Sequence, residues 1–518
     1  MRPNLATGAS TTGVRVASLL AFLGAFVAGG PLLRAQDAPR SYAVQPAFFP
    51  GALDPGEPGS ATRALNDDIL NNLDPGEPTA GNTADFESRL RAIEERLRRD
   101  QNSASPDGIA DGDKAAADSK KPAYKLAARL QLDYWGFPNT SPGADAFENG
   151  NASESIQDRF LLRRLRIGAA GDIAENVVFR FDVDFGSSPN SPQLKDCFIG
   201  MEELPILQTL LVGNQKRPYS LDSINSTNVN LFMERPAVID AFNPDYRRFG
   251  AQSWGFSSDL TYNWRYGVFL GQDLASLGTI FATPVNEDLQ GEVAGRLAST
   301  WWYDESSDGR GYGHWAVAAA VASPDGDDPV NNTARFRSRP EARTTERWLD
   351  TGPIAGAHTY ELIGLEALLN LGPFQAVSEY QQVWVQRDGS DEVTFLGAYG
   401  YLSYFLTGEH IPWDRETGQL GRVKPFENFF LVRQQDGGVC SGLGAWEVCI
   451  RYSYCDLTDG DIAGGVSSEV TLGLNWYWNE WSRMQFNYVH GTIIDHEPVD
   501  GYTDADFDIL GMRLAMFF

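Results

Sequence analysis

The chain has 518 residues, with 42 Lys and Arg against 69 Asp and Glu, and a formal net charge of −27. This deficit of basic residues argues against nucleic acid as a partner, because such an interface needs clustered positive charge. Beyond the N-terminus no run of about 18 apolar residues occurs, which argues against a helical membrane protein. The 13 Trp and 52 Gly are typical of a transmembrane β-barrel, where aromatic belts lie at the membrane interfaces.

The N-terminal segment has the pattern of an export signal. Arg2 and Arg15 supply positive charge, residues 16–30 are apolar or small, and Leu33–Ala35 offers a cleavage site. A short membrane anchor is the alternative, although the apolar run is short for a membrane span. Because no Cys follows the cleavage site, a lipoprotein is not expected. We therefore predict a signal peptide over residues 1–35 and an exported mature protein.

Three further segments precede the main domain. Residues 36–84 are acidic and rich in Pro and Gly, which predicts a linker. Residues 85–100 predict a short coiled-coil helix of about two heptads, with a lone amphipathic helix on a surface as the alternative. Its apolar residues recur at heptad spacing, at Phe86, Leu90, Ile93 and Leu97. Residues 101–122 are rich in Asp, Ala, Lys and Ser, and predict a second, flexible linker.

From residue 123 to the end, strand-length segments alternate bulky apolar residues with polar ones, between clusters of turn-forming residues. The segment from Leu260 to Val268 is typical, because Leu, Tyr, Trp, Tyr and Val alternate with Thr, Asn, Arg and Gly. A soluble sandwich also alternates, but rarely carries Trp and Tyr so often on its packed face. With about 25 residues per strand, residues 123–518 predict an all-β, transmembrane antiparallel barrel of about 16 strands. A barrel of that size leaves a water-filled channel.

The end of the chain supports this fold and gives a location. Leu510, Met512, Leu514, Met516 and Phe518 share one face of a strand. The final strand of a bacterial outer-membrane barrel closes the sheet, shows an apolar face to lipid and ends on Phe as an assembly signal. We therefore predict the outer membrane of a Gram-negative-type bacterium as the location.

The polar faces of the predicted strands carry arginines that are expected to line the lumen. They are Arg164, Arg166, Arg180, Arg265, Arg296 and Arg451. A guanidinium group stays charged and binds oxyanions through two parallel hydrogen bonds, so such a lining predicts an anion path. The alternative is a transverse field without anion selectivity, in which carboxylates face the arginines across the pore. Asp182, Asp184, Asp196 and Glu447 are available for that arrangement.

Residues 217–250 form a long irregular stretch between two predicted strands. A loop of this length needs a function. Folding into the channel is the usual one, since charged side chains then set selectivity in the narrowest zone. A cell-surface loop is the alternative. The cationic candidates on and beside this loop are Lys216, Arg217, Arg235, Arg247 and Arg248.

Enzyme and metal motifs are missing from the sequence. The five His form no HExxH motif, and no GxSxG nucleophile motif occurs. The acidic run Asp456–Asp461 lacks the spacing of an EF-hand, so an ordinary turn is preferred over a weak calcium site. Cys440 and Cys449 either form a disulfide in an oxidising compartment or remain free thiols. We therefore expect no catalytic residue, metal or cofactor.

Several motifs, in the same order along the chain, resemble those of the phosphate-selective porin O and P family of outer-membrane channels. They include Arg163–Gly168, Val212–Ser220, Phe232–Arg235, Arg451–Ser453 and Leu472–Tyr477. The resemblance covers nearly the whole region after Tyr124. It implies a trimeric barrel of about 16 strands with inward-folded loops and an anion path lined by Arg and Lys. This chain has only seven Lys, four of them in or beside the linker, whereas the phosphate-binding members rely on clustered lumen Lys.

We therefore expect an outer-membrane porin that allows passive diffusion of small solutes through an Arg-lined, water-filled pore. Inorganic phosphate and other anions are the candidate solutes, the lipids of the outer membrane and a homotrimer are the expected partners, and no nucleic acid is expected. The alternative function is structural. In that case the barrel anchors the envelope, and the N-terminal coil links it to periplasmic partners.

Overall fold

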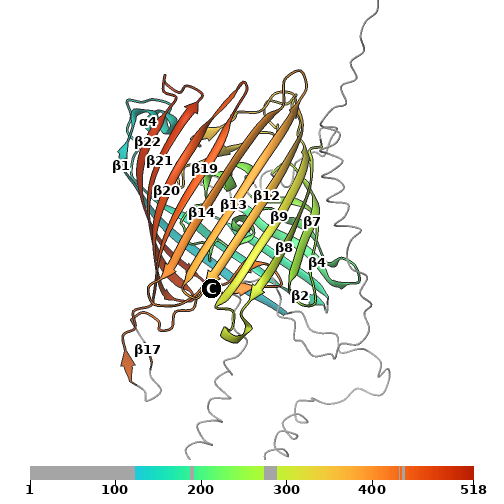
Figure 1. The fold of residues 1–518 in the computed structure, drawn as a ribbon, viewed down its shortest axis with the longest axis vertical. Coiled ribbons are helices and arrows are strands. Elements are labelled where there is room, and N and C mark those ends of the chain that lie inside the picture. Colours follow the sequence, from blue (N-terminus) through green and yellow to red (C-terminus); the bar gives the residue numbers. More distant parts are fainter. Residues whose placement is uncertain are drawn as a thin grey trace, which may run out of the picture. The chain divides into compact units, whose positions relative to one another are not determined.

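The computed structural model describes residues 123–518, except 175, 187–191, 245, 274–288, 431 and 434–437. The predicted signal peptide, linkers and coiled coil lie outside the described residues and stay predictions. Between residues 123 and 518 the strands form a closed antiparallel barrel of 16 strands, as predicted (Figure 1). Each barrel strand pairs with its neighbours along the chain, and the last strand returns to pair with the first.

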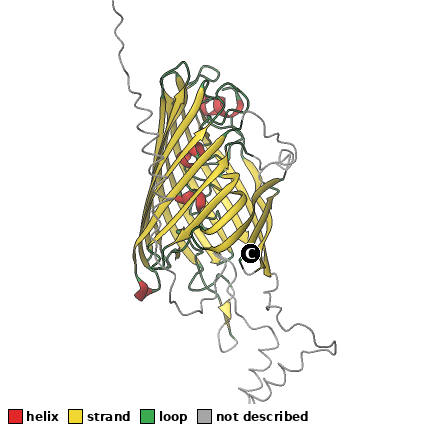
Figure 2. Cartoon of the chain, turned by 90° about the vertical axis from the view of Figure 1, so that its right-hand side faces the viewer, coloured by secondary structure: helices red, strands yellow, loops and turns green. Residues whose placement is uncertain are grey.

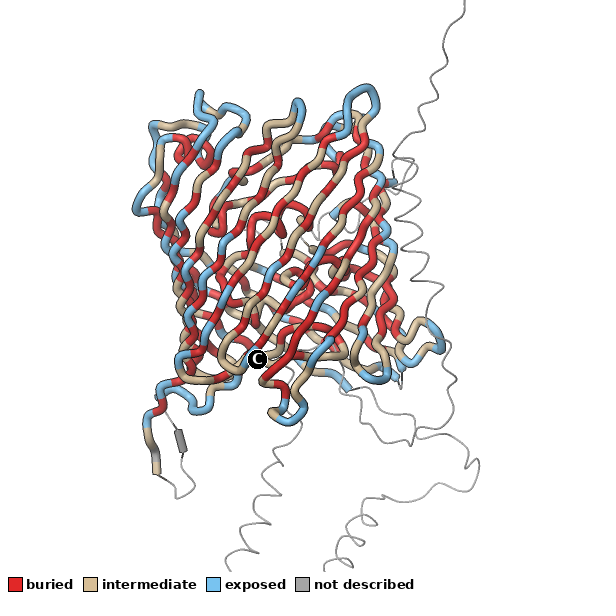
Figure 3. The backbone as a smooth tube through the Cα atoms, in the orientation of Figure 1, coloured by how far each residue is buried: buried red, intermediate tan, exposed pale blue. Residues whose placement is uncertain are grey.

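The barrel strands have the following bounds: β1 (Ala123–Thr140), β2 (Arg159–Ala174), β3 (Val177–Asp184), β4 (Gln193–Leu204), β5 (Gln208–Lys216), β6 (Arg247–Phe256), β7 (Tyr262–Leu270), β8 (Gly291–Tyr303), β9 (Gly311–Ser323), β12 (Ala357–Leu371), β13 (Phe374–Arg387), β14 (Val393–Phe405), β19 (Ala445–Asp459), β20 (Ile462–Asn479), β21 (Ser482–His496) and β22 (Ala505–Phe517). The alternation seen in the sequence becomes an alternation of burial along each strand, because successive side chains point to the lumen and to the outside (Figure 3).

Strand β22 closes the barrel as predicted. Asp133 of β1 lies opposite Arg513 of β22. Arg513 faces the lumen and is 2 % exposed, whereas Leu510 and Met516 on the other face are each 46 % exposed. The exposed row faces lipid. Because β22 pairs with β1, the sheet has no free edge with unpaired backbone groups.

The two rims of the barrel differ. Short turns, such as residues 372–373 and 480–481, lie at the rim where the chain enters β1 and leaves β22. Short turns are typical of the periplasmic side of outer-membrane barrels, so we name this the periplasmic rim and the other the extracellular rim. The wall also varies in height, because β3 has 8 residues and β7 has 9, whereas β20 has 18.

Three long connections pack inside the barrel or along its rim. The lumen loop (residues 217–246) carries α5 (Leu221–Ile224) and α6 (Ala237–Phe242). The second loop (residues 324–356) carries β10 (Arg337–Ser338) and β11 (Leu349–Asp350). The periplasmic connection (residues 406–444) carries two small hairpins, β15 (Trp413–Asp414) with β16 (Gln419–Leu420), and β17 (Val432–Arg433) with β18 (Val439–Cys440). A further helix, α4 (Pro142–Asn149), follows β1, and Figure 2 shows helices within the barrel.

The lumen loop folds inward, as the sequence analysis preferred, and not over the cell surface. Leu231, Phe232 and Ile239 of the loop are buried in one hydrophobic cluster with wall residues such as Tyr401. Aromatic and aliphatic side chains at the middle of the loop bury their apolar surface against the wall, and this burial favours the inward path.

Three details differ from the sequence analysis or complete it. Arg247 and Arg248 belong to β6 and not to the loop, because β6 starts at Arg247, which pairs with Lys216. No disulfide links the cysteines of the described residues, so Cys440 and Cys449 are not joined. No helix in the described part of the chain is long and apolar enough to cross a membrane.

Candidate functional site

The structure places all eleven predicted cations inside the barrel, each buried or half-buried. Seven of them form ion pairs: Arg166 with Asp184 (3.0 Å), Arg180 with Asp182 (2.8 Å), Arg217 with Glu292 (2.7 Å), Arg235 with Asp222 (2.5 Å), Arg247 with Asp196 (2.7 Å), Arg296 with Glu366 (2.6 Å) and Arg451 with Glu341 (2.5 Å). The other four donate to neutral oxygens: Arg164 to Gln131, Lys216 to the carbonyls of Ile224 and Asn225, Arg248 to that of Gly271, and Arg265 to that of Thr417. The lining is therefore cationic in sequence but largely compensated in space.

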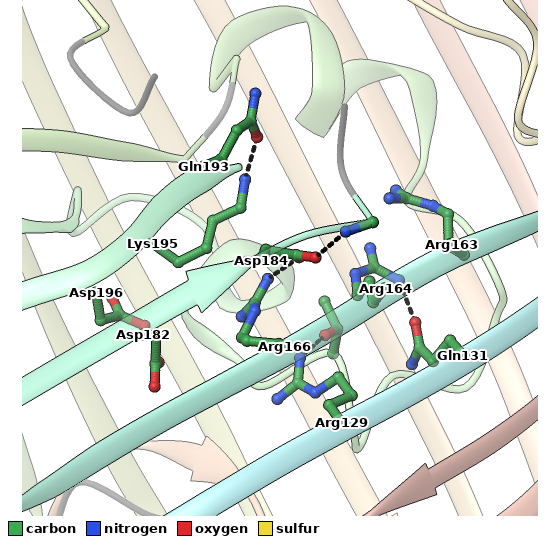
Figure 4. Close-up of polar contacts among 12 residues, drawn as sticks. Arg129, Gln131, Arg163, Arg164, Arg166, Asp182, Asp184, Gln193, Lys195 and Asp196 are labelled. Atoms are coloured by element: carbon green, nitrogen blue, oxygen red, sulfur yellow. Dashed lines mark hydrogen bonds and ion pairs between the residues drawn. The ribbon is translucent and has the colours of Figure 1, made fainter. Parts of the chain in front are cut away.

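Figure 4 shows arginines of β1 and β2 that donate hydrogen bonds to acceptors of the protein itself. Arg164 Nη1 donates to Gln131 Oε1 at 2.5 Å, and Arg166 Nη2 donates to Asp184 Oδ2 at 3.0 Å (Figure 4). Arg129 donates to two hydroxyl groups of the lumen loop. These guanidinium groups hold protein acceptors together, so fewer of their donors are left for a passing solute.

Glu234 of the lumen loop is clamped by two arginines of the wall. Arg163 binds it through two hydrogen bonds, from Nε at 2.7 Å and Nη2 at 2.8 Å. Arg513 Nη2 donates to Glu234 at 2.8 Å and also binds Asp133 at 2.7 Å. Burial opposes ionisation of Glu234, yet Arg163 and Arg513 hold the pKa of this carboxyl well below its usual range. We call this group the Glu234 clamp.

Arg163 was missed as a site residue because of a β-bulge. The sequence analysis placed Arg164 in the lumen by strict alternation, which leaves Arg163 on the lipid side. In the structure Gln131 pairs with Arg164 but Leu132 pairs with Leu162, so one extra residue interrupts the alternation. The bulge lets Arg163 and Arg164 both reach the lumen. Bulges leave no distinct mark in a single sequence.

Arginines also bind main-chain carbonyls of the lumen loop. Arg451 Nη2 donates to the carbonyl of Glu234 at 3.1 Å, and Arg483 Nη2 donates to that of Asn230 at 2.7 Å. Carbonyls in an irregular, buried segment need donors, since no neighbouring strand supplies them. These side chains therefore stabilise the inward path of the loop.

The start of the lumen loop is held by a carboxylate from the opposite side. Glu379 of β13 accepts from the backbone N–H groups of Leu221 (3.1 Å) and Asp222 (2.8 Å), and from the hydroxyl of Tyr399 (2.5 Å). The first N–H groups of a helix have no partner within the helix, and Glu379 satisfies two of them in α5.

The second loop is docked by Glu341. This carboxylate accepts from Arg451 Nε at 2.9 Å, from Ser453 Oγ at 2.5 Å and from the hydroxyl of Thr471. One buried acid thus joins the loop to β19 and β20. Because Arg451 also binds the lumen loop, the two loops are connected through the wall.

The tip of the second loop differs from the rest of the lining. Arg343 makes no hydrogen bond or ion pair with any residue that the structure describes. The guanidinium group of Arg339 donates only to the carbonyls of Thr344 and Thr345, and its backbone N–H donates to Asp240 Oδ2 at 3.5 Å. Burial and the like charges of Arg163 and Arg339 lower the pKa of Arg343 to about 9. At neutral pH Arg343 is still charged. Arg343 and Arg339 therefore form a positive site whose guanidinium groups are in no ion pair with a described residue, and we name it the Arg343 tip. The sequence analysis did not single out either residue.

The periplasmic connection enters from the other side. Trp413 Nε1 of its first hairpin donates to Thr300 Oγ1 at 2.9 Å, and its ring stacks on Tyr312 with 5.4 Å between centroids. The backbone N–H of Leu420 donates to Asn225 Oδ1 of the lumen loop at 3.0 Å. Loop, hairpin and wall meet at a small pocket, whose lining includes Asp222, Asn230, Phe232, Tyr401, Leu420 and Arg451. The lining of this pocket therefore combines an acidic side chain, a basic side chain and aromatic rings.

The calcium alternative at residues 456–461 is replaced by ordinary contacts. Asp461 pairs with Arg387 at 2.7 Å, and Asp459 accepts from the backbone N–H of Thr394 at 2.7 Å. Among the described residues, no group of three His, Cys, Asp or Glu side chains is arranged to hold a metal ion.

A closed 16-stranded barrel with a charged interior and inward-folded loops defines the porin class. Residues 125–518 match the family model for "Phosphate-selective porin O and P". The chain therefore belongs to the phosphate-selective porin O and P family, and the family locates it in the outer membrane.

The chain is also similar to one further sequence and to solved structures of outer-membrane proteins. An "uncharacterized protein" of Caulobacter vibrioides is 26 % identical over 427 residues, covering 77 % of this chain and 80 % of that protein. The trimer form of OmpT, an outer membrane protein of Vibrio cholerae, is 9 % identical with a TM-score of 0.46, covering 77 % of this chain and all of that one. An anion-selective porin from Comamonas acidovorans is 11 % identical with a TM-score of 0.43, covering 76 % of this chain and all of that one.

Proposed function

We propose that this porin passes small solutes by diffusion with a modest preference for anions and without a phosphate-specific site. The observation that carries this proposal is the pairing of the lining, since seven of the eleven predicted cations are in ion pairs. Diffusion of small solutes agrees with the family of the chain.

A phosphate-specific path needs cationic donors that are free to replace the hydration shell of the anion. Breaking a buried ion pair costs about 3–5 kcal/mol, so a passing phosphate does not displace the carboxylate partners. Lysine also gives no support to a phosphate-specific path. The chain has few lysines, and Lys216 in the lumen already donates to two carbonyls. The paired cations of the lining therefore give only a weak preference for anions over cations.

The modest anion preference is assigned to the Arg343 tip. Arg343 and Arg339 lie on a loop from the extracellular rim, and their guanidinium groups form no ion pair with a described residue. A positive site of this kind raises the local concentration of anions, an effect that weakens as ionic strength rises.

Planar-bilayer recording of the purified protein tests this function. We expect stepwise currents, a reversal potential in a KCl gradient that corresponds to about a twofold preference for chloride, and no block of the chloride current by phosphate at low millimolar concentration. Absence of stepwise current would contradict diffusion. A preference for potassium contradicts the anion assignment alone, and block by micromolar phosphate contradicts the lack of a phosphate site.

We also propose a homotrimer that associates through the low part of the wall. Strands of 8 or 9 residues, such as β3 and β7, barely span the hydrocarbon layer when tilted. Their outer faces are apolar, with Phe181 46 % and Val268 56 % exposed, and neighbouring copies would cover them. Cross-linking in outer-membrane vesicles tests this proposal, and a product no larger than the single chain contradicts it.

A further inference from the structure

The periplasmic connection continues beyond its lumen hairpin and emerges at the periplasmic rim, where β17 lies below the wall (Figure 1). Three large apolar side chains there are strongly exposed, Phe426 and Phe430 at 66 % each and Leu443 at 72 %. Such exposure in water is unfavourable by about 25 cal/mol for each Å² of apolar surface. A covering environment is therefore expected.

This patch is fixed to the outside of the barrel wall. The backbone N–H of Phe429 donates to the carbonyl of Trp478 at 2.7 Å, and the ring of Phe429 meets that of Trp476 edge-on with 4.5 Å between centroids. The carbonyl of Leu443 accepts from two indoles, Trp476 Nε1 at 2.9 Å and Trp446 Nε1 at 3.2 Å. The position of the patch is thus set by the wall.

The patch continues the lipid-facing surface of the barrel. Trp446 and Trp476 stack with 4.9 Å between centroids, and they alternate along their strands with the buried residues Glu447 and Asn475. Trp rings on the outer face near a rim belong to the aromatic belt at the membrane interface. The exposed Phe and Leu side chains therefore meet the membrane where this belt lies.

A basic group accompanies the aromatic ones. Lys424 is 68 % exposed and lies 3.9 Å from Glu480. Arg422, two residues earlier, lies over the ring of Phe517, which is buried on the lumen face of β22, so Arg422 belongs to the inner side of the rim. An exposed cation beside aromatic rings matches an interface where phosphate groups lie above acyl chains.

We propose that residues 424–430 and 442–443 form a membrane foot that binds phospholipid of the inner leaflet of the outer membrane. Phe426, Phe430 and Leu443 enter the boundary between headgroups and acyl chains, and Lys424 contacts the phosphodiester. Interfacial binding of this kind scales with the buried apolar area plus the attraction of basic side chains to anionic lipid. The foot anchors the periplasmic connection, whose first hairpin lies in the lumen. This inference concerns the lipid contact and does not depend on the solute that the pore passes.

An environment-sensitive NBD label at Leu443→Cys, in a Cys440→Ser background, tests the foot. The protein is reconstituted in vesicles of phosphatidylethanolamine and phosphatidylglycerol. The matched control carries the label at Asp308→Cys, in a turn at the same rim, and the Cys440→Ser protein alone reports labelling of the remaining cysteines. We expect the label at residue 443 to emit at shorter wavelength, to be quenched by brominated lipid and to react with dithionite about tenfold more slowly than the control.

Two results overturn the proposal. Dithionite reactivity equal to that at residue 308 means that the patch faces water. Protection from dithionite without quenching by brominated lipid means that protein covers it, such as a second copy of the chain. A double substitution, Phe426→Ser with Phe430→Ser, gives a second measurement. We expect a lower Tm in vesicles but an unchanged Tm in detergent micelles, with unchanged single-channel conductance. An equal loss of Tm in both media would mean that the rings only support the fold.

Discussion

The Glu234 clamp and the Arg343 tip use the same side chain for opposite purposes. In the clamp, Arg163 and Arg513 both bind the carboxylate of Glu234, and these ion pairs hold the lumen loop against the wall. At the tip, Arg343 has no acceptor among the described residues, and the guanidinium group of Arg339 binds only carbonyls. The difference shows that an arginine in a pore holds a loop when acceptors of that loop lie within reach, and is left for a solute when they do not.

The same contrast appears between the two sides of the wall. Cations without a carboxylate partner gather on the first strands, as Arg164, Lys216, Arg248 and Arg265 show. Carboxylates without an ion pair lie on later strands, as Glu379, Glu447 and Glu469 show, although Arg483 is a cation of the later side. The aspartates that the sequence analysis placed across the pore lie beside their arginines, since Arg166 pairs with Asp184 on the neighbouring strand and Arg180 pairs with Asp182 on its own strand. The arginines of the lining are therefore compensated locally and not from the opposite wall.

Removing the clamp is expected to have the largest effect. Glu234→Gln leaves Arg163 and Arg513 with one carboxylate fewer, and loss of a partner from a buried pair costs about 3–5 kcal/mol. We expect a lower Tm and a larger, noisier single-channel conductance, because the lumen loop moves from the pore. Glu346→Gln, on the exposed part of the second loop, is the matched control. A wild-type conductance in Glu234→Gln would show that the loop is held by its apolar contacts alone.

Removing the opposite anchor is expected to have an intermediate effect. Glu379→Gln keeps one oxygen acceptor but puts an amide group, which donates, in place of the second oxygen that accepts from α5. Loss of a hydrogen bond between neutral groups costs about 0.5–1.5 kcal/mol, so the Tm falls less than in the clamp variant. Thermal unfolding of both variants in the same detergent measures the order. A larger fall for Glu379→Gln reverses the assignment of the main anchor.

Removing charge at the tip is expected to change selectivity and leave the fold intact. Arg343→Gln takes away a cation that forms no ion pair with a described residue, so the chloride preference falls from about twofold toward one. Stability is unchanged or rises slightly, because like-charge repulsion with Arg163 and Arg339 is relieved. Arg415→Gln, whose partner Glu305 lies at the periplasmic rim, is the control. If both variants shift the reversal potential equally, the effect belongs to net charge and not to the tip.

The smallest effect of all is expected from mild acid, which leaves the ion pairs of the Glu234 clamp intact. The pKa of Glu234 is lowered from its ordinary value of 4.5, so the clamp contributes stability above that pH and loses it only as pH falls through the lowered pKa. We expect Tm and conductance of the wild-type protein to show no clamp-dependent change between about pH 7 and pH 5. The comparison is with Glu234→Gln over the same range. A change near pH 6 that this variant lacks assigns a raised pKa to Glu234 and contradicts the clamp.

The fold was predictable because period-two alternation is local. The row from Leu510 to Phe518 predicted a lipid face with Arg513 on the other side, and both were confirmed. The same rule placed Arg166, Arg296 and Arg451 inside the barrel. It failed at Arg163, since a bulge changes which face the next residue takes. The start of β6 was also missed, because the pairing of Arg247 with Lys216 depends on a residue across the loop.

Thus the sequence by itself determined the class of fold, the lipid-facing rows and the presence of many arginines on the lumen face, because neighbours in a strand decide all three. Only the tertiary structure decided what those arginines do. Arg163 and Glu234 are 71 positions apart and Arg513 and Glu234 are 279 apart, so no local pattern links them. Coulomb attraction depends on the distance between two charges in space, and closure of the barrel and the inward path of the loops set that distance.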